Sequence, residues 1–173
     1  MKKMISTRQL ILLSLLIAMD VLFSRVLALN TSLVKIGLGF AATGVAALLY
    51  GPWWAAAESA LADTLGALLF PTGAYNPCFS VTALCTGLIF GLCLRGERPS
   101  ALRCLMAAGL NCLLVELTAN TLLIHWFYGV PLEWPFLGLR LLKFAVMLPV
   151  EFLVLWLLAR RGTLRGALNQ IDR

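Results

Sequence analysis

The amino-acid sequence predicts an all-α integral membrane protein, a single bundle of six transmembrane helices with both termini in the cytoplasm. Of its 173 residues, 61% are hydrophobic and only 13% are charged, whereas soluble domains are nearer half apolar and a quarter charged. The apolar residues gather into six runs near the roughly 20 residues that a bilayer requires. Because no run alternates like a membrane β-barrel strand, we expect helices, which satisfy their own backbone hydrogen bonds.

The six predicted helices form one membrane domain spanning residues 1–173. They cover residues 9–28, 36–50, 52–70, 79–94, 104–127 and 141–159. A signal peptide is the alternative for the first run, since two lysines precede it. Asp20 and Arg25 interrupt that run and no small-residue cleavage site follows, which favours a transmembrane helix.

Two loops rich in proline and aromatic residues separate the middle helices. The turn Tyr50-Gly51-Pro52 ends the second helix, and the two tryptophans after it are typical of a membrane interface. FPTGAYNPCF, residues 70–79, separates the third helix from the fourth, because its prolines cannot continue a helix. This loop is either a rigid turn with interface anchors or part of a binding site.

The positive charges predict the orientation of the bundle. Ten of the 14 Lys and Arg residues fall at the N-terminus, between helices four and five, and in the tail. With six helices these three groups lie on one side, which the positive-inside rule makes the cytoplasm. The net charge of +6 mostly reports this topology, and no clustered basic face indicates a nucleic-acid partner.

The other four cations, Arg25, Lys35, Arg140 and Lys143, lie toward the outer side, where positive charge is disfavoured. Either they snorkel to lipid headgroups or they form an outward-facing site for an anionic ligand. In the last helix, Arg140, Lys143, Met147 and Glu151 share one face. A charged stripe of this kind should face protein or water, although Glu151 is equally explained by a structural salt bridge.

Other polar and small residues also fall on defined helix faces. Asp63 lies among alanines on the third helix, where a neighbouring helix or a ligand can reach it. Ser14 and Ala18 form a small-xxx-small pair on the face that also carries Arg25 by helical spacing. Such pairs are common, and ordinary helix packing is the favoured explanation of this pair taken by itself. Glu116 and the asparagines of the fifth helix should be paired inside the bundle.

The chain shows no catalytic or metal-binding signature. Its five cysteines form no CxxC pair and it has one histidine, which argues against a metal site. It lacks a recognisable hydrolase arrangement and a GxxxxGK phosphate-binding loop. We therefore expect no enzymatic activity and no cofactor, and an ATP-driven role would need another subunit.

The central block, residues 33–92, resembles helices two to four of the folate-family S components. These are the substrate-binding subunits of energy-coupling-factor (ECF) vitamin transporters. LYGPWW, ADTLGALLFPTGAY and TGLIFGL carry most of the likeness, and RLLKFAVMLPVE is similar to the last helix of the family. The resemblance implies six helices, vitamin capture at the outer side of a bacterial plasma membrane, and three partners: a transmembrane coupling subunit and two ABC ATPases. It also places the coupling face at Ser14 and Ala18, with serine where the family has alanine.

Folate would suit the residues singled out above. The resemblance favours the binding interpretation of the loop, with Tyr75, Phe79 and Phe70 stacking on a flat ring and the Asn76 amide bonding its edge. Asp63 would pair with the aminopyrimidine edge. The four outer cations Arg25, Lys35, Arg140 and Lys143 would receive the glutamate tail. The alternatives are an S component for another vitamin or ring compound, a small structural scaffold subunit of the membrane and, third, a membrane enzyme.

Overall fold

The computed structural model describes residues 7–30, 35–71, 76–96, 99–131 and 133–160. Within them the chain forms six helical rods and one short strand pair. The elements are α1 (Thr7–Val21) with its π-helical continuation η1 (Leu22–Val26), β1 (Leu29–Asn30), β2 (Lys35–Ile36), α2 (Phe40–Tyr50), α3 (Pro52–Leu69), α4 (Pro77–Cys93), the continuous rod α5 (Ala101–Leu110), η2 (Asn111–Ala119) and α6 (Asn120–Tyr128), and α7 (Trp134–Arg160).

The predicted helices are all present, and two of their starts were wrong. The second begins at Phe40 instead of residue 36, because Lys35 and Ile36 form β2, which pairs antiparallel with β1. The sixth begins at Trp134 instead of residue 141, because a proline is compatible with the first helical turn. Because we expected only helices from the sequence, the prediction missed this small hairpin.

The bundle is that of a helical membrane protein. Among the described residues, three helices are long and apolar enough to cross a bilayer: Thr7–Val26, Ala101–Tyr128 and Trp134–Arg160. Helices α2 and α4 are apolar but shorter. The exposed surface carries many leucines on α1, α5, α6 and α7, as expected of helices that face lipid.

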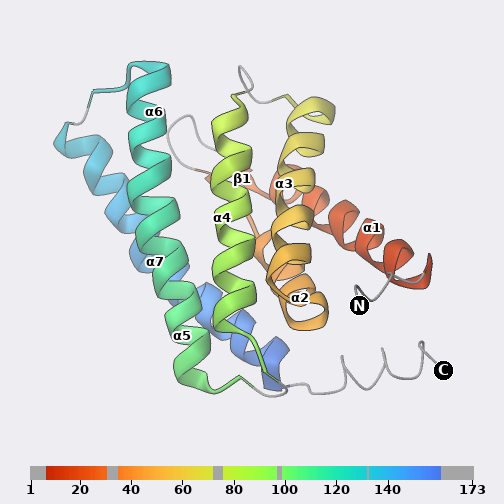
Figure 1. Ribbon diagram of the computed structural model, residues 1–173. Helices are drawn as coiled ribbons and strands as arrows, with labels where there is room; N and C mark the ends of the chain where they lie inside the picture. The colour runs from red at the N-terminus through yellow and green to blue at the C-terminus, as the bar shows by residue number, and fades with distance from the viewer. Residues whose placement is uncertain (1–6, 31–34, 72–75, 97–98, 132, 161–173) are drawn as a thin grey trace.

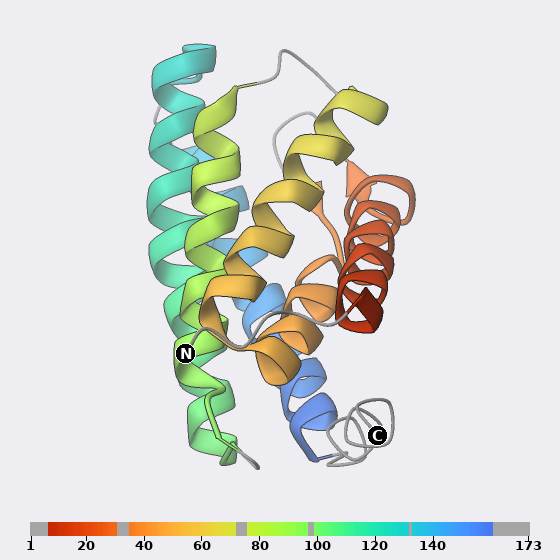
Figure 2. The same cartoon turned by 45° about the vertical axis from the view of Figure 1, so that its right-hand side comes forward.

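Helix α4 runs through the middle of the bundle (Figure 1). Its contact with α3 is the most extensive in the fold, and it also touches α2, α5, η2 and α6. Turned by 45°, α3 crosses in front of the bundle between α4 and α1 (Figure 2). Helix α4 therefore connects the α1–α3 part of the molecule to the rod α5–η2–α6.

Two glycines allow the close contact between α4 and α3. A Cβ on Gly91 would lie 2.1 Å from the Cα of Pro52, and one on Gly87 would lie 2.4 Å from the carbonyl oxygen of Ala55. Both obstacles are backbone atoms, which cannot rotate away as the end of a side chain can. The two helices approach this closely only because these positions carry no side chain.

Gly91→Ala should therefore destabilise the protein. Overpacking of this kind costs about 1–3 kcal/mol, and we expect a lower unfolding temperature in detergent. The matched control is Gly109→Ala in α5, where an added Cβ meets nothing within 4 Å. There alanine should stabilise the helix by roughly 0.5–1 kcal/mol. Equal melting temperatures for the two variants would contradict the packing argument.

The apolar core lies at one end of the bundle. Its fully buried members include Ala46 of α2, Ala55 of α3, Phe90 of α4, Cys104 of α5 and Leu155 of α7. These residues come from the ends of the helices that meet at the bottom of Figure 1. The opposite half, toward the α3–α4 and α6–α7 connections, contains polar side chains in the interior.

Candidate functional site

Two groups of polar side chains occupy the half of the bundle opposite the apolar core. The Asp63 cluster comprises Arg25, Asp63, Thr64 and Ser80, from η1, α3 and α4. The Lys143 cluster comprises Asn111, Glu116, Arg140, Lys143 and Glu151, from η2 and α7. Each cluster contains residues that the sequence predicted as site residues.

In the Asp63 cluster, the carboxylate joins three helices. Arg25 Nη2 lies 3.0 Å from Asp63 Oδ1 in an ion pair. Ser80 Oγ of α4 donates to Asp63 Oδ2 at 2.9 Å, and Thr64 Oγ1 lies 3.1 Å from Ser80 Oγ. Asp63 thus uses one oxygen for η1 and the other for α4, and its side chain remains 24% exposed.

The π-helical turn η1 places Arg25 in this cluster. The spacing rule put Arg25 on one face with Ser14 and Ala18, and this prediction was wrong. Ser14 and Ala18 are exposed on α1, whereas the Arg25 side chain is largely buried against α3. In η1 the Leu27 N–H donates to the Leu22 carbonyl, five residues back, and this wider turn rotates Arg25 away from the exposed face.

The Lys143 cluster joins α7 to the π-helical segment η2. Lys143 Nζ forms an ion pair with Glu116 Oε2. About two turns further along α7's buried face, Asn111 Nδ2 donates to both carboxylate oxygens of Glu151, at 3.1 and 3.0 Å. Glu151 therefore has a structural partner on another helix, as one interpretation of the sequence expected, although this partner is an amide and not a cation.

Arg140 has a different environment from those of Arg25 and Lys143, the other two cations in the interior. Arg140 is 5% exposed, and its guanidinium lies 5.4 Å from the centroid of the Phe136 ring. Its buried Nε has no hydrogen-bond partner. Neither of the ion pairs found among the described residues includes it. Arg140 and Lys143 lie on the buried face of α7, as their spacing predicted, which argues against snorkelling to lipid.

Helix α4 links the two clusters through its hydroxyl side chains. Ser80 contacts Asp63, as described above. Thr82 Oγ1 donates to Asn120 Oδ1 at 3.0 Å, and Thr86 Oγ1 donates to Asn111 Oδ1 at 2.8 Å. The prediction that both asparagines are paired within the bundle is confirmed. Helix α4 therefore contacts both clusters, and a movement of side chains in one cluster can reach the other through this helix.

Two of the predicted loop residues, Asn76 and Phe79, lie where α4 begins. Asn76 caps this helix, its Oδ1 accepting from the Cys78 N–H at 3.0 Å. The ring of Phe79 lies 6.2 Å from that of Tyr128 in α6, and Phe70 is exposed at the end of α3. Tyr75 lies outside the described residues. Lys35 is in β2, where its backbone pairs with Asn30.

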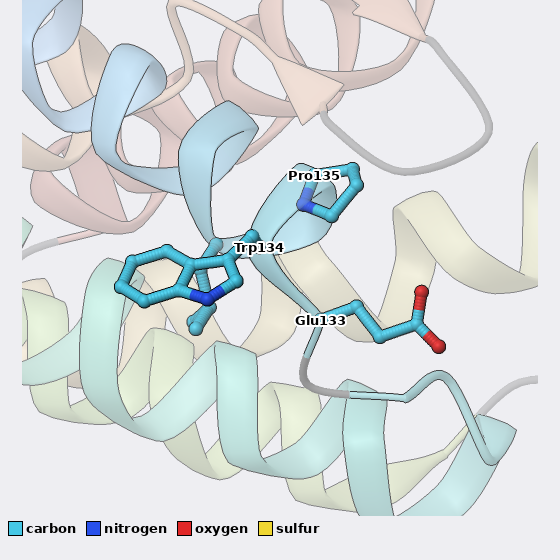
Figure 3. Close-up of a pocket in the computed structure, with 4 residues that line it drawn as sticks. Glu133, Trp134 and Pro135 are labelled. Atoms are coloured by element: carbon cyan, nitrogen blue, oxygen red, sulfur yellow. The ribbon is translucent and has the colours of Figure 1, made fainter.

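An open hollow of about 510 Å³ lies where α7 begins, lined by Glu133, Trp134, Pro135 and Leu137. Figure 3 shows the Trp134 ring and the Glu133 carboxylate pointing in different directions. Trp134 is 85% exposed, which is typical of an interface anchor. None of the predicted site residues lines this hollow, so we place the candidate site at the two polar clusters.

Sequence reasoning missed the partners that complete the clusters. Ser80 was not singled out, and Glu116 was expected to be paired without a named partner. The only available signal for Glu116 was its place in an apolar segment, four residues before Asn120. Another buried polar contact, Thr43 Oγ1 donating to Asp20 Oδ2 at 3.0 Å, joins α2 to α1 outside both clusters.

The known proteins that are similar to this chain are transporters or components of transporters. The family model described as "ECF transporter, substrate-specific component" matches residues 8–163. A relative named "Folate transporter FolT", from Clostridium novyi (strain NT), is 31% identical over 163 residues, which cover 94% of this chain and 89% of the relative. A protein of the same name from Leuconostoc mesenteroides subsp. mesenteroides is 29% identical over 152 residues, covering 85% and 82%.

A solved structure is also similar over most of the chain. It is described as "Crystal structure of FolT bound with folic acid" and superposes with a TM-score of 0.86 at 30% sequence identity. The superposition covers 91% of this chain and 95% of that one. The likeness in fold therefore extends over most of this chain.

Proposed function

The chain belongs to the family of ECF transporter substrate-specific components, and from this premise we propose that it captures folate at the outer side of a bacterial plasma membrane for ATP-driven uptake. The family consists of binding subunits of transporters and not of enzymes. The partners we propose are an ECF transmembrane coupling subunit and two ABC ATPases, with membrane lipid around the bundle.

The observation that carries folate as the ligand is the likeness to the folic acid-bound structure. That protein shares 30% identity with this chain over nearly its whole length, and two relatives are named as folate transporters. Likeness at this level supports the ligand class.

We propose that the chain crosses the membrane six times, with both termini in the cytoplasm. In this orientation the polar half of the bundle faces outward and the apolar core lies at the cytoplasmic end. Support comes from Arg95 and Arg103, which flank the α4–α5 connection, and from Arg160 at the end of α7, all at the core end. The positive-inside rule places such residues in the cytoplasm.

The Lys143 cluster suits the glutamate tail of folate, which carries two carboxylates. Arg140 is a buried cation outside both ion pairs described above, and an uncompensated buried charge is costly. A ligand carboxylate would supply the missing counter-ion, and the planar guanidinium suits bidentate pairing. Lys143, one turn away on the same buried face, would bind the second carboxylate.

The Asp63 cluster suits the pterin. A carboxylate pairs well with an aminopyrimidine edge, and Asp63 remains partly exposed although Arg25 and Ser80 hold it. Arg25 then orients Asp63 and is less available to the tail than the sequence suggested. Asn76 and Phe79 at the start of α4 are proposed to contact the rings, as is Tyr75, and Lys35 is proposed to add positive charge for the glutamate tail.

The test begins with the purified protein. Mass spectrometry of co-purified small molecules should find folate in stoichiometric amount, and a titration should show saturable binding. In liposomes the chain alone should bind folate without ATP-dependent accumulation, because it contains no GxxxxGK motif. Accumulation should appear when the coupling subunit and the ATPases are added.

The other outcomes separate the alternatives. A different stoichiometric vitamin would make the chain an S component of another specificity. Absence of any ligand, together with failure to bind folate, would favour a scaffold subunit. ATP-driven uptake by the isolated chain would contradict the proposed division of labour.

A further inference from the structure

We propose that Glu116 sets how much negative charge the site accepts: its carboxylate neutralises Lys143 in the empty protein, and a ligand carboxylate takes its place. This inference rests on the proposed function, and it assigns a specificity-determining role to a residue that does not itself attract the anionic ligand.

The two partners of the Lys143–Glu116 ion pair are unequally buried. The Lys143 side chain is 9% exposed, whereas that of Glu116 is 31% exposed. The cation is therefore fixed in the protein interior while the acid stands closer to the outside. In an exchange of counter-ions, Glu116 is the partner that can leave, because it can be hydrated when it does.

Ligand entry would leave the cluster with an excess of negative charge. The cluster holds two buried cations, Arg140 and Lys143, and of its two acids Glu116 forms the ion pair with Lys143. Glu151 is the second acid, but both of its oxygens accept from the Asn111 amide, which fixes its position. When a tail with two carboxylates enters, two cations meet four carboxylates unless Glu116 withdraws, and buried like charges repel strongly.

The backbone of Glu116 is suited to such a withdrawal. It lies in η2, a π-helical segment of nine residues, Asn111–Ala119. There the Asn120 N–H donates to the Val115 carbonyl, and the Thr118 hydroxyl donates to the Leu113 carbonyl at 2.8 Å. π-helical turns are rare and concentrate at functional sites. A change of this segment to the α-helical register would turn Glu116 away from Lys143 while the rod stays helical.

The experiment compares Glu116→Gln with the wild type, using folate and a pterin that lacks the glutamate tail. Removing a competing carboxylate should tighten folate binding on the order of tenfold, as is typical for one displaced charged contact. The tail-less pterin should bind unchanged. The empty variant should melt at a lower temperature, because Lys143 loses its counter-ion, and folate should raise that temperature more than in the wild type. Glu133→Gln, an exposed acid near the same end of α7, is the matched control and should alter neither ligand.

A second variant keeps the proposal testable if Glu116→Gln does not fold. Glu116→Gln combined with Lys143→Met removes both charges at once. In this background the gain in folate affinity should vanish, and pterin binding should remain. Equal loss of both ligands in Glu116→Gln, or unchanged folate binding, would overturn the proposal and leave a structural ion pair. A wild type that fails to bind folate would instead overturn the proposed function, whatever the variants do.

Discussion

Replacing Ala18 by tryptophan is expected to stop ATP-driven folate uptake while folate binding persists. Ser14 and Ala18 are exposed on α1, one turn apart, so a partner helix can approach closely there. A tryptophan ring would hold such a helix away. Arg25 lies seven residues further along the rod, roughly 10 Å at the α-helical rise, and its side chain is turned inward. The change should therefore leave the proposed ligand contacts intact.

The measurement is folate uptake into liposomes containing the full transporter, alongside a binding titration on the isolated chain. Ala145→Trp is the matched control, since Ala145 is an exposed alanine on α7. It should preserve both uptake and binding. If Ala18→Trp removes binding and uptake to the same extent, this face of α1 belongs to the ligand site or to the stability of the fold.

Arg140→Ala is expected to weaken folate binding by about ten- to a hundredfold. A charge-assisted hydrogen bond contributes roughly 1.5–3 kcal/mol, which corresponds to that range of affinity. The guanidinium is buried, its Nε has no hydrogen-bond partner, and it lies outside the two ion pairs. A pterin without the glutamate tail should bind the variant nearly as well as the wild type.

The check is a titration of both ligands against Arg140→Ala and Lys143→Ala, with thermal unfolding as the control for folding. Lys143→Ala should act in the same direction and less strongly, because an ammonium lacks the bidentate fork of arginine. Its effect is further reduced because Glu116 already neutralises Lys143 in the empty protein. Equal loss of both ligands would show that α7 does not bind the tail, and Lys35 would be the next cation to test.

The helices could be located from sequence because apolar runs of membrane length have few alternative structures. Their boundaries depended on residues compatible with more than one structure. Residues 36–39, Ile-Gly-Leu-Gly, extend an apolar run, yet Ile36 pairs with Leu29 in the hairpin. At α7, the predicted start at residue 141 left Pro135 outside the helix, although a helix accepts proline in its first turn.

The candidate site was predictable where one helix determines it. The spacing of Arg140, Lys143, Met147 and Glu151 was enough to place them on one face, and that face is buried. Contacts between helices were not predictable, since a single sequence does not state which helices are neighbours. The pairing of Asp63 with Ser80 and of Lys143 with Glu116 is of this kind. The π-helical turns were missed because the spacing rule assumes 3.6 residues per turn.

The shortness of α2 has a consequence for how the chain enters the membrane during synthesis. Eleven residues rise about 16 Å, roughly half of a hydrocarbon core. The tight turn at Gly51, with φ of 82°, leads directly into α3. Helix α3 carries the buried Glu58, and its Ser59 hydroxyl donates to the Ala83 carbonyl of α4 at 2.8 Å. Neither α2 nor α3 is a good insertion signal by itself. We expect the translocon to release α2, α3 and α4 into lipid together, so that in a nascent chain cut before α4 the segment α2–α3 would not hold a fixed orientation.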